Sequence, residues 1–411
     1  MQKIAIISYF HYESSLCLAK SIAEQGVTVD YFAIVDMFHD KGTVPGIDYH
    51  KAPKHPGLIR LTSVNAPEIC GYYEGLPVNL FLFRLVSFSR RLMLLNKIVF
   101  KIVLNKIKSA KYDAINIVGQ WPWVEIIHNE LKDENLTHTF HEVGSHFKGE
   151  LSTPLMETVI RDKSKVILPS KSTLDRFRTL DRNCYCLSEY IPFGKFETLM
   201  LYRKPTELKI QFKNDSPIFL FYGFIKPYKG LDLLKRACEI LNNRKVDFNL
   251  IVAGSGDDPT LPFYSTKKNC VVINRILYDN EMMYLNDISD VVLLPYKTAS
   301  QSGIIPTSFI FGNPIIATKV GALVESIQDG KNGILVNAED AVSFADAMQS
   351  LITDQNLMSL LKHGARQYGN GDEYDWHNIA KQTMSVLMNH KNTYHIPQPS
   401  QILPSVRHDD E

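Results

Sequence analysis

Two lysines in one short segment have the type and spacing to hold a diphosphate. Gly223 ends the apolar run 219–222, and Lys226 and Lys229 lie in the turn that opens the next helix. A glycine at a strand end lets a ligand approach the backbone closely, and a helix N-terminus favours negative charge. The same strand, turn and helix with surface lysines is also ordinary structure, so this segment alone leaves both interpretations open.

A second anion site is predicted at the loop 300–303. This loop follows a buried strand that ends at Pro295, and it starts the next helix. Exposed backbone amides of Gln301, Ser302 and Gly303 would face the first site. The two loops together would surround a diphosphate.

The elements that must position these loops are predicted from alternating apolar runs and helical patterns, which are typical of parallel sheets with crossover helices. The length of 411 residues suits two domains of about 200 residues each, and 45% hydrophobic with 22% charged content is ordinary for globular proteins. The polar segment 193–214 separates two sets of predicted strands. These are 4–8, 27–33, 114–118, 137–141, 166–168 and 185–190, then 217–222, 248–253, 270–273, 291–294, 314–317 and 333–336.

As an ordered set, the motifs closely resemble family 4 glycosyltransferases, which have the GT-B fold. The resemblance covers most of residues 110 to 385. In the second half it rests on the segments 219–234, 290–296, 300–306, 311–317, 320–325 and 329–336. Upstream it rests on Phe140-His-Glu142, Ser145-His146, Val166 to Ser172 and Tyr190 to Gly194.

The resemblance implies an α/β protein with two Rossmann-like parallel-sheet domains that face a central crevice. Residues 1–195 would form the acceptor domain, 196–214 the linker and 215–373 the nucleotide-sugar domain. Residues 374–389 would form a helix that returns to the first domain. The proline-containing segment 390–411 is predicted to be a disordered tail.

His141 is the residue expected nearest the reacting centre. It ends a predicted strand at the crevice, and the matching histidine of the family contacts the donor sugar. With Lys229 it is predicted to be catalytic. The alternative is a strand-end histidine bonded to backbone. The predicted diphosphate-binding residues are Gly223, Lys226, Lys229, Gln301, Ser302 and Gly303.

On the acceptor side the candidates are His11, Glu142 and Trp121. The loop after the first strand contains Tyr9 and Phe10 and has no GxGxxG pattern, which argues against a nicotinamide or flavin cofactor. His11 would contact the acceptor or diphosphate, or is a surface histidine. Glu142 would line the crevice or only cap a turn, and Trp121 would stack on a sugar or belong to the core.

One departure from the family concerns its two glutamates. The matching positions hold Ala299 and Thr307, and the chain has the Ser300–Gly303 loop instead. This loop resembles a variant found in polysaccharide-assembly members. The ribose hydroxyls therefore need another acceptor, which the sequence does not identify.

The stretch 80–111 suggests an anionic membrane surface as a partner. Eight positive charges occur there, and no acid lies between Glu74 and Asp113. Basic helices with large apolar faces bind such surfaces. The alternative is a core helix whose lysines reach water. The charges are Arg84, Arg90, Arg91, Lys97, Lys101, Lys106, Lys108 and Lys111.

Other ligand and location classes are not favoured. A formal net charge of +1 gives no general attraction to nucleic acid. No DxD or His/Asp cluster suggests an essential metal, and no cofactor is expected. The six cysteines show no zinc spacing, and reduced thiols are expected. The N-terminus is too quickly polar for a signal peptide, and no apolar run suits a membrane span. A cytoplasmic protein, peripheral at the membrane, is predicted.

The function that the resemblance implies is retaining transfer of a sugar from a nucleoside-diphosphate sugar to a glycan or lipid-linked glycan. Two alternatives remain open at this point. One is a GT-B nucleotide-sugar epimerase, which needs no second sugar substrate. The other is a catalytically inactive scaffold that binds a glycan or nucleotide; the missing glutamates favour it, whereas the lysine pair argues against it.

Overall fold

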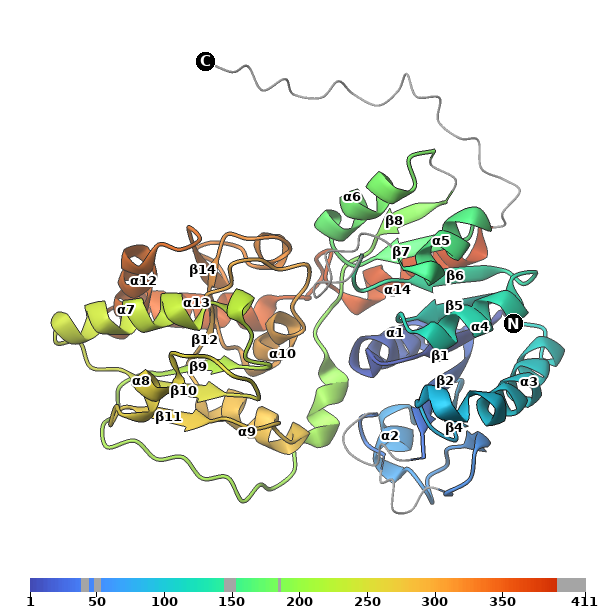
Figure 1. Ribbon diagram of the computed structural model, residues 1–411, viewed down its shortest axis with the longest axis horizontal. Coiled ribbons are helices and arrows are strands. Elements are labelled where there is room, and N and C mark those ends of the chain that lie inside the picture. The colour runs from blue at the N-terminus through green and yellow to red at the C-terminus, as the bar shows by residue number, and fades with distance from the viewer. Residues whose placement is uncertain (38–43, 48–52, 144–152, 184–185, 390–411) are drawn as a thin grey trace.

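The protein contains two sheets, each flanked by helices (Figure 1). The computed structural model describes residues 1–37, 44–47, 53–143, 153–183 and 186–389. The first sheet has the strand order β3-β4-β2-β1-β5-β6-β7-β8, and the second has the order β11-β10-β9-β12-β13-β14. Every pairing among the described strands is parallel except that of β3 with β4. The predicted α/β class with parallel sheets is confirmed.

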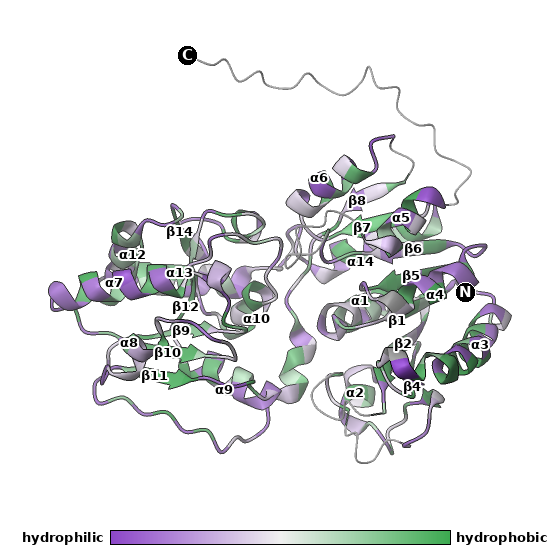
Figure 2. Ribbon diagram, in the orientation of Figure 1, coloured by the Kyte–Doolittle hydropathy of each residue, from purple (hydrophilic) through white to green (hydrophobic). Residues whose placement is uncertain are grey.

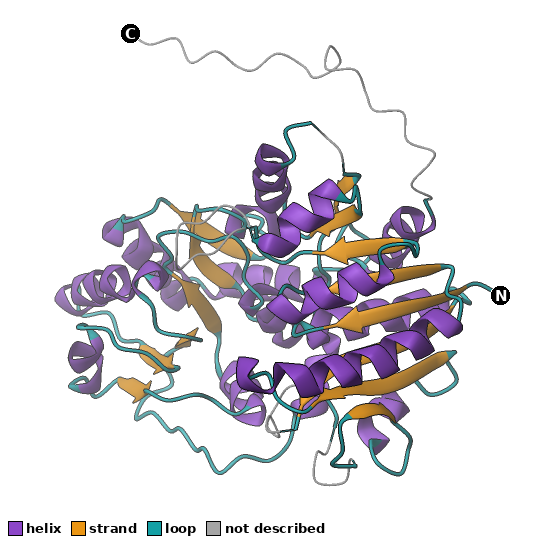
Figure 3. Cartoon of the chain, turned by 45° about the vertical axis from the view of Figure 1, so that its right-hand side comes forward, coloured by secondary structure: helices purple, strands orange, loops and turns teal. Residues whose placement is uncertain are grey.

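The first sheet and its helices are built from the following elements. The strands are β1 (Lys3–Ser8), β2 (Thr28–Asp36), β3 (Gly57–Arg60), β4 (Val78–Leu85), β5 (Ala114–Val118), β6 (Leu136–Thr139), β7 (Lys165–Leu168) and β8 (Ser188–Tyr190). The helices are α1 (Tyr12–Glu24), α2 (Pro67–Tyr72), η1 (Arg90–Leu92), α3 (Met93–Ser109), α4 (Pro122–Leu131), α5 (Pro154–Arg161) and α6 (Lys171–Leu180). Figure 3 shows helices lying across the strands.

The second sheet follows the 3₁₀ segment η2 (Glu197–Tyr202). Its strands are β9 (Ile218–Tyr222), β10 (Asn249–Ala253), β11 (Cys270–Ile273), β12 (Val291–Leu294), β13 (Ile315–Thr318) and β14 (Gly333–Val336). The helices are η3 (Pro227–Lys229), α7 (Leu231–Asn243), α8 (Leu261–Ser265), α9 (Asp279–Ile288), α10 (Ile304–Phe311), α11 (Leu323–Ser326), α12 (Ala341–Thr353), α13 (Gln355–Gln367) and α14 (Trp376–Met388).

The central strands are buried on both faces, because helices cover each side of a parallel sheet. Figure 2 shows the hydrophobic residues concentrated along these strands. Strand β5 and strand β10 are buried along their whole length, for example. Such strands read as continuous apolar runs, which is why the sequence predicts them well. Within the part of the chain that the structure describes, no helix is long and apolar enough to cross a membrane.

One strand corrects a sequence interpretation. The apolar run 80–83 belongs to β4, which pairs with β2 inside the first sheet, and it does not face a membrane. Arg84 in the same strand is only 2% exposed, and its Nη1 donates to the carbonyl of Pro53 at 2.5 Å. The exposed part of the basic stretch therefore begins after β4. The motif Ser145-His146 and the predicted tail 390–411 lie outside the described residues.

The last helix, α14, packs against the first sheet although it follows the second sheet in the chain. In Figure 1 its red ribbon lies among β5, β6 and β7. The Nζ of Lys165, which is 3% exposed, donates to the Leu387 carbonyl at 2.6 Å, the Asn389 carbonyl at 2.7 Å and the Asn135 Oδ1 at 2.6 Å. A cation at a helix C-terminus satisfies the last carbonyls and favours the helix dipole. Lys165 thus anchors the end of α14.

Removing this buried cation should loosen α14. Lys165→Met leaves two backbone carbonyls and Asn135 without their charged donor, at a cost of about 3 kcal/mol in the free energy of unfolding. For a domain of ~200 residues this corresponds to a melting temperature lower by roughly 6–12 °C. Differential scanning fluorimetry measures the shift. Lys106→Met, at an exposed position, is the control. An equal melting temperature for both variants would show that Lys165 is not an anchor.

Candidate functional site

The candidate site is built around Gly223, the residue after β9. Its φ is 108°, a conformation that side chains with a Cβ rarely adopt. A Cβ placed there would lie 3.9 Å from the Nζ of Lys229 and 3.5 Å from the Cδ1 of Ile304. The glycine therefore keeps open the space directly beside the Lys229 ammonium.

Lys229 ends the 3₁₀ turn η3, and its side chain is partly buried. Its Nζ donates to the hydroxyl of Tyr296 at 2.5 Å and lies 4.1 Å from the centre of that ring. Burial lowers the pKa of Lys229 to about 8. Among the ion pairs of the described residues, none involves Lys229. A desolvated ammonium without a carboxylate partner is suited to an incoming anion.

Lys226 lies in the same turn. It is the residue before η3, and its carbonyl accepts the backbone N–H of Lys229 at 2.9 Å. Its side chain is partly exposed. The structure therefore brings Gly223, Lys226 and Lys229 together at one strand end.

The loop 300–303 precedes α10 on the neighbouring strand end, after β12. Within the described residues, the backbone amides of Gln301, Ser302 and Gly303 donate no hydrogen bond. The Oγ of Ser302 is buried and also has no hydrogen-bond partner there. Ile304, the next residue, approaches Gly223, so this loop borders the lysine turn. Free amides beside an ammonium form a second set of donors for one anion.

His141 lies just beyond β6 and is 6% exposed. Its ring is stacked between His11, at a centroid distance of 3.4 Å, and Phe193, at 4.6 Å. Burial lowers the pKa of His141 well below its usual value, and the neighbouring His11 lowers it further. Burial likewise lowers the pKa of His11 to about 4, although part of its surface meets solvent. Both imidazoles are neutral at physiological pH.

The remaining acceptor-side candidates lie around this pair. Trp121 is 43% exposed and stacks on Tyr9 at a centroid distance of 5.7 Å. Glu142 is exposed, and its carbonyl accepts the side-chain amide of Gln120. The pKa of Tyr228, in the η3 turn of the other sheet domain, is raised by burial and then by Glu142. Glu142 is therefore close enough to the lysine turn to influence it electrostatically.

Three residues near this site had no role in the sequence analysis. Tyr296 follows β12 and holds Lys229, Phe193 supports His141, and Glu325 reaches across to the first domain. Each residue belongs to one of the sequence segments on which the family resemblance rests, but the residue that it contacts is evident only in the folded structure. Two positions match the glutamates of the family. Thr307 is buried, and its Oγ1 donates to the carbonyl of Gly303, whereas Ala299 has no polar side chain that could accept a hydrogen bond from a ligand.

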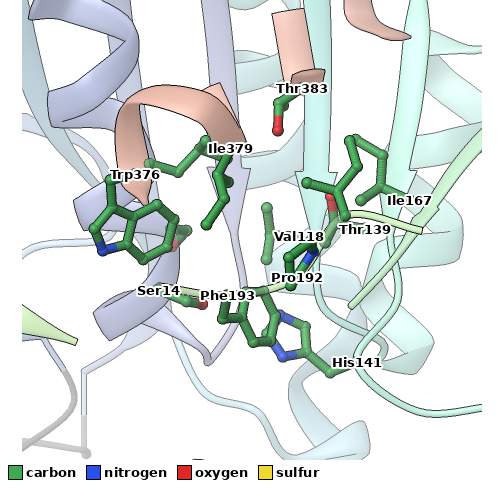
Figure 4. A pocket seen from close by; sticks show the side chains of 13 residues that line it. Ser14, Val118, Thr139, His141, Ile167, Pro192, Phe193, Trp376, Ile379 and Thr383 are labelled. Carbon is green, nitrogen blue, oxygen red and sulfur yellow. The ribbon is translucent and has the colours of Figure 1, made fainter. Parts of the chain in front are cut away.

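A pocket lined in part by His141 lies between α1, α14 and the first sheet (Figure 4). Its lining is largely apolar, and Trp376 and Ile379 come from α14. None of Gly223, Lys226 and Lys229 lines it. A second pocket lies between the two sheet domains and is bordered by Ser302. The charged strand ends are the better candidate for an anion site, because no Lys or Arg lines the pocket beside His141.

This arrangement defines a protein of the GT-B fold. Residues 216–354 match the family model described as Glycosyl transferases group 1. A D-inositol 3-phosphate glycosyltransferase of Xylanimonas cellulosilytica is 31% identical over 160 residues, which is 37% of this chain and 38% of that protein. For the first three curated relatives the match spans only 38% to 48% of their length.

Solved structures agree over nearly the whole chain. The sucrose-phosphate synthase of Thermosynechococcus elongatus superimposes with a TM-score of 0.62 at 17% identity, covering 94% of this chain and 98% of that one. Anabaena HepE in complex with UDP-glucose gives 0.58 at 14% identity, covering 94% and 100%. The predicted GT-B fold and the resemblance to family 4 glycosyltransferases are confirmed. The type assigned to the Ser300–Gly303 loop stays a prediction.

The pKa of Lys229 leads to a testable pH dependence. Because burial lowers it to about 8, the ammonium is charged below that pH and neutral above it. A diphosphate ligand should therefore bind with up to about tenfold lower affinity per pH unit above 8, since a proton must first be taken up. Isothermal titration calorimetry at several pH values measures this. Lys229→Arg keeps its charge throughout this pH range, so the fall in affinity above pH 8 should be absent in this variant. A fall that persists in Lys229→Arg would assign it to another group.

Proposed function

We propose that this protein is a retaining glycosyltransferase. It moves a sugar from a nucleoside-diphosphate sugar to a glycan or lipid-linked glycan in polysaccharide or glycoconjugate biosynthesis. The observation that carries the proposal is the half-buried Lys229 ammonium without an acidic partner, beside Gly223 and the free backbone amides of Gln301, Ser302 and Gly303. The family match of residues 216–354 and the nucleotide complexes of solved relatives support it.

The two sheet domains divide the work in this proposal. Residues 215–373 bind the donor nucleotide, and residues 1–195 bind the acceptor, with 196–214 as the linker. The crossing of residues 374–389 to the first domain ties the two. The neutral pair His11 and His141 faces the sugar, and Trp121 offers an exposed ring on which an acceptor pyranose can stack.

The chemical difficulty is the diphosphate leaving group, whose negative charge grows as the glycosidic bond breaks. Groups fixed in place before the reaction stabilise that charge more in the transition state than in the ground state. Lys226, Lys229 and the amides of Ser302 and Gly303 have this role. As in the family, a departing phosphate oxygen takes the proton of the acceptor hydroxyl, so no protein nucleophile is required.

A ligand screen followed by a turnover assay tests the proposal. Thermal shift with UDP, GDP, ADP and their glucose conjugates identifies the nucleotide, because a ligand held only by the folded state raises the melting temperature. Product analysis with the selected donor then follows, with and without a mixed glycan pool. Transfer only with the pool supports the glycosyltransferase. A rearranged sugar from donor alone would indicate an epimerase, and binding without turnover an inactive scaffold.

Two substitutions should separate the walls of the crevice. Lys229→Ala removes a transition-state charge donor and should lower kcat/KM by about two orders of magnitude or more. His141→Ala should impair transfer while leaving the dissociation constant of the free nucleoside diphosphate nearly unchanged, because the nucleotide lies on the opposite wall. Steady-state kinetics and calorimetry measure both effects.

Matched controls for this pair are Lys235→Ala on α7 and His363→Ala on α13, both outside the site. Melting curves confirm that each variant is folded. Near-normal turnover in folded Lys229→Ala would disprove the diphosphate assignment. If His141→Ala lost nucleotide affinity and turnover in equal proportion, His141 would belong to the nucleotide wall instead.

We further propose that the protein docks on the cytoplasmic face of a membrane through α3. One face of α3 packs into the first domain, with Phe100, Val103 and Ile107 buried. The other face carries an apolar ridge at helical spacing: Leu94 is 77%, Ile98 60% and Ile102 53% exposed. Exposed lysines flank the ridge, namely Lys97, Lys101 and Lys106. An apolar ridge between cations matches an anionic lipid surface.

Vesicle binding tests the α3 surface. Lys97→Gln with Lys101→Gln should weaken binding to phosphatidylglycerol vesicles by tenfold or more, since each basic residue contributes about 1 kcal/mol. Leu94→Asn with Ile98→Asn should also weaken vesicle binding, and the loss should be the same at low and high salt because it removes apolar contact. The affinity of the wild-type protein should fall as salt is added, because salt screens the lysines. Lys268→Gln with Lys331→Gln, on the second domain, is the charge-matched control. Wild-type protein that ignores these vesicles at low salt would refute the docking surface.

A further inference from the structure

The loop that carries Ser302 and Gly303 is tied to the other domain. The Nε2 of Gln301 donates to the carbonyl of Pro169 at 3.1 Å. The Oγ of Ser170 donates to the carbonyl of Ser300 at 3.3 Å. Pro169 and Ser170 form the turn between β7 and α6 in the first domain. The position of the loop 300–303 therefore depends on contact between the two domains.

Glu325, in α11 of the second domain, makes the strongest of these contacts. Its Oε2 accepts the backbone N–H of Lys171 at 2.7 Å, and its Oε1 accepts that of Ser172 at 3.0 Å. These are the first two residues of α6, whose amides have no partner within the helix and form its positive end. A carboxylate from one domain thus caps a helix of the other.

The remaining bonds around Glu325 show that its position is fixed. Its backbone carbonyl accepts the hydroxyl of Tyr374, which begins the crossing back to the first domain. Glu325 also lines the pocket between the domains together with Gln301 and Ser302. Both carboxylate oxygens of Glu325 are engaged by the first amides of α6.

We propose that Glu325 is a positioning residue that fastens the closed arrangement of the two domains. Its bonds to α6 hold the β7–α6 turn against the loop 300–303, and that turn in turn holds the loop amides toward the diphosphate. The inference rests on the proposed donor site. The charged cap joins groups from both domains, so it can form only when the domains are closed. It therefore stabilises the closed state and not the open one.

Hydrogen exchange of single amides tests the contact without any ligand. In Glu325→Ala the amides of Lys171 and Ser172 should exchange at least about tenfold faster than in wild type, since water then becomes their only partner. The amide of Thr173 is an internal control, because its partner is the Oγ of Ser170 in the same domain at 3.1 Å. Mass spectrometry with electron-transfer fragmentation resolves these positions. Unchanged exchange at Lys171 and Ser172 would overturn the cap.

Kinetics test the positioning role. Glu325→Ala should lower kcat/KM for transfer about tenfold, equal to the loss of one charge-assisted contact. Glu325→Gln, which keeps an acceptor oxygen but loses the charge, should lie between wild type and Glu325→Ala and covers the case of poor folding. Glu239→Ala on α7 is the control. Faster exchange with unchanged kinetics would make Glu325 a structural cap only. Wild-type protein that binds none of UDP, GDP and ADP and turns over no donor would instead contradict the proposed function.

Discussion

The positive charge of Lys229, left without an acidic partner, is the constraint on which the rest of the site depends. Burial disfavours the charged form, and the nearest polar partner is a neutral hydroxyl, that of Tyr296. The η3 turn that carries Lys229 lies where the end of β9 meets the end of β12. A Cβ at Gly230 would lie 1.8 Å from the carbonyl of Pro295, so only glycine allows η3 to sit against β12. We expect a bound anion to stabilise this charge.

The opposite wall is electrostatically different, and the difference has a physical origin. Two imidazoles stacked at a ring distance of 3.4 Å disfavour a double positive charge, and burial favours the neutral form of His141. His141 is also covered by Phe193, which excludes water from its other face. The lysine turn is therefore cationic, whereas His141 on the opposite wall is neutral. In the proposed function, this difference favours the diphosphate on the second domain and hydroxyl-rich groups on the first.

The sequence predicts what local pattern determines and misses what distant contacts determine. Short apolar runs give β5, β11, β12 and β14 with the observed bounds. Strands β5 and β12 are buried along their whole length, whereas β11 and β14 are partly buried edge strands that still present mainly apolar residues. Strand β4 was missed because Arg84 and the neighbouring lysines made 80–111 resemble one basic surface stretch. Glu325 had no predicted role, since the amides that it caps lie more than 150 residues earlier in the chain. The stacking of His141 on His11 likewise joins two strand ends that no local pattern relates.

The contacts between the two domains are of two kinds, and their difference governs how the crevice can open. Where the chain passes from one domain to the other, the contacts are mainly apolar. Phe196 and Leu199 of the linker pack against Met283 of the second domain. Beside them, the indole N–H of Trp376 donates to the carbonyl of Lys195 at 2.7 Å. Around the loop 300–303 the contacts are single hydrogen bonds, each worth about 1 kcal/mol net or somewhat more where Glu325 supplies charge. We expect opening to break these polar contacts before the packed ones, which would then act as the pivot. In the proposed function, a few polar bonds at the loop 300–303 let a nucleotide enter and leave and still favour closure around it, whereas an apolar contact there would hold the crevice shut.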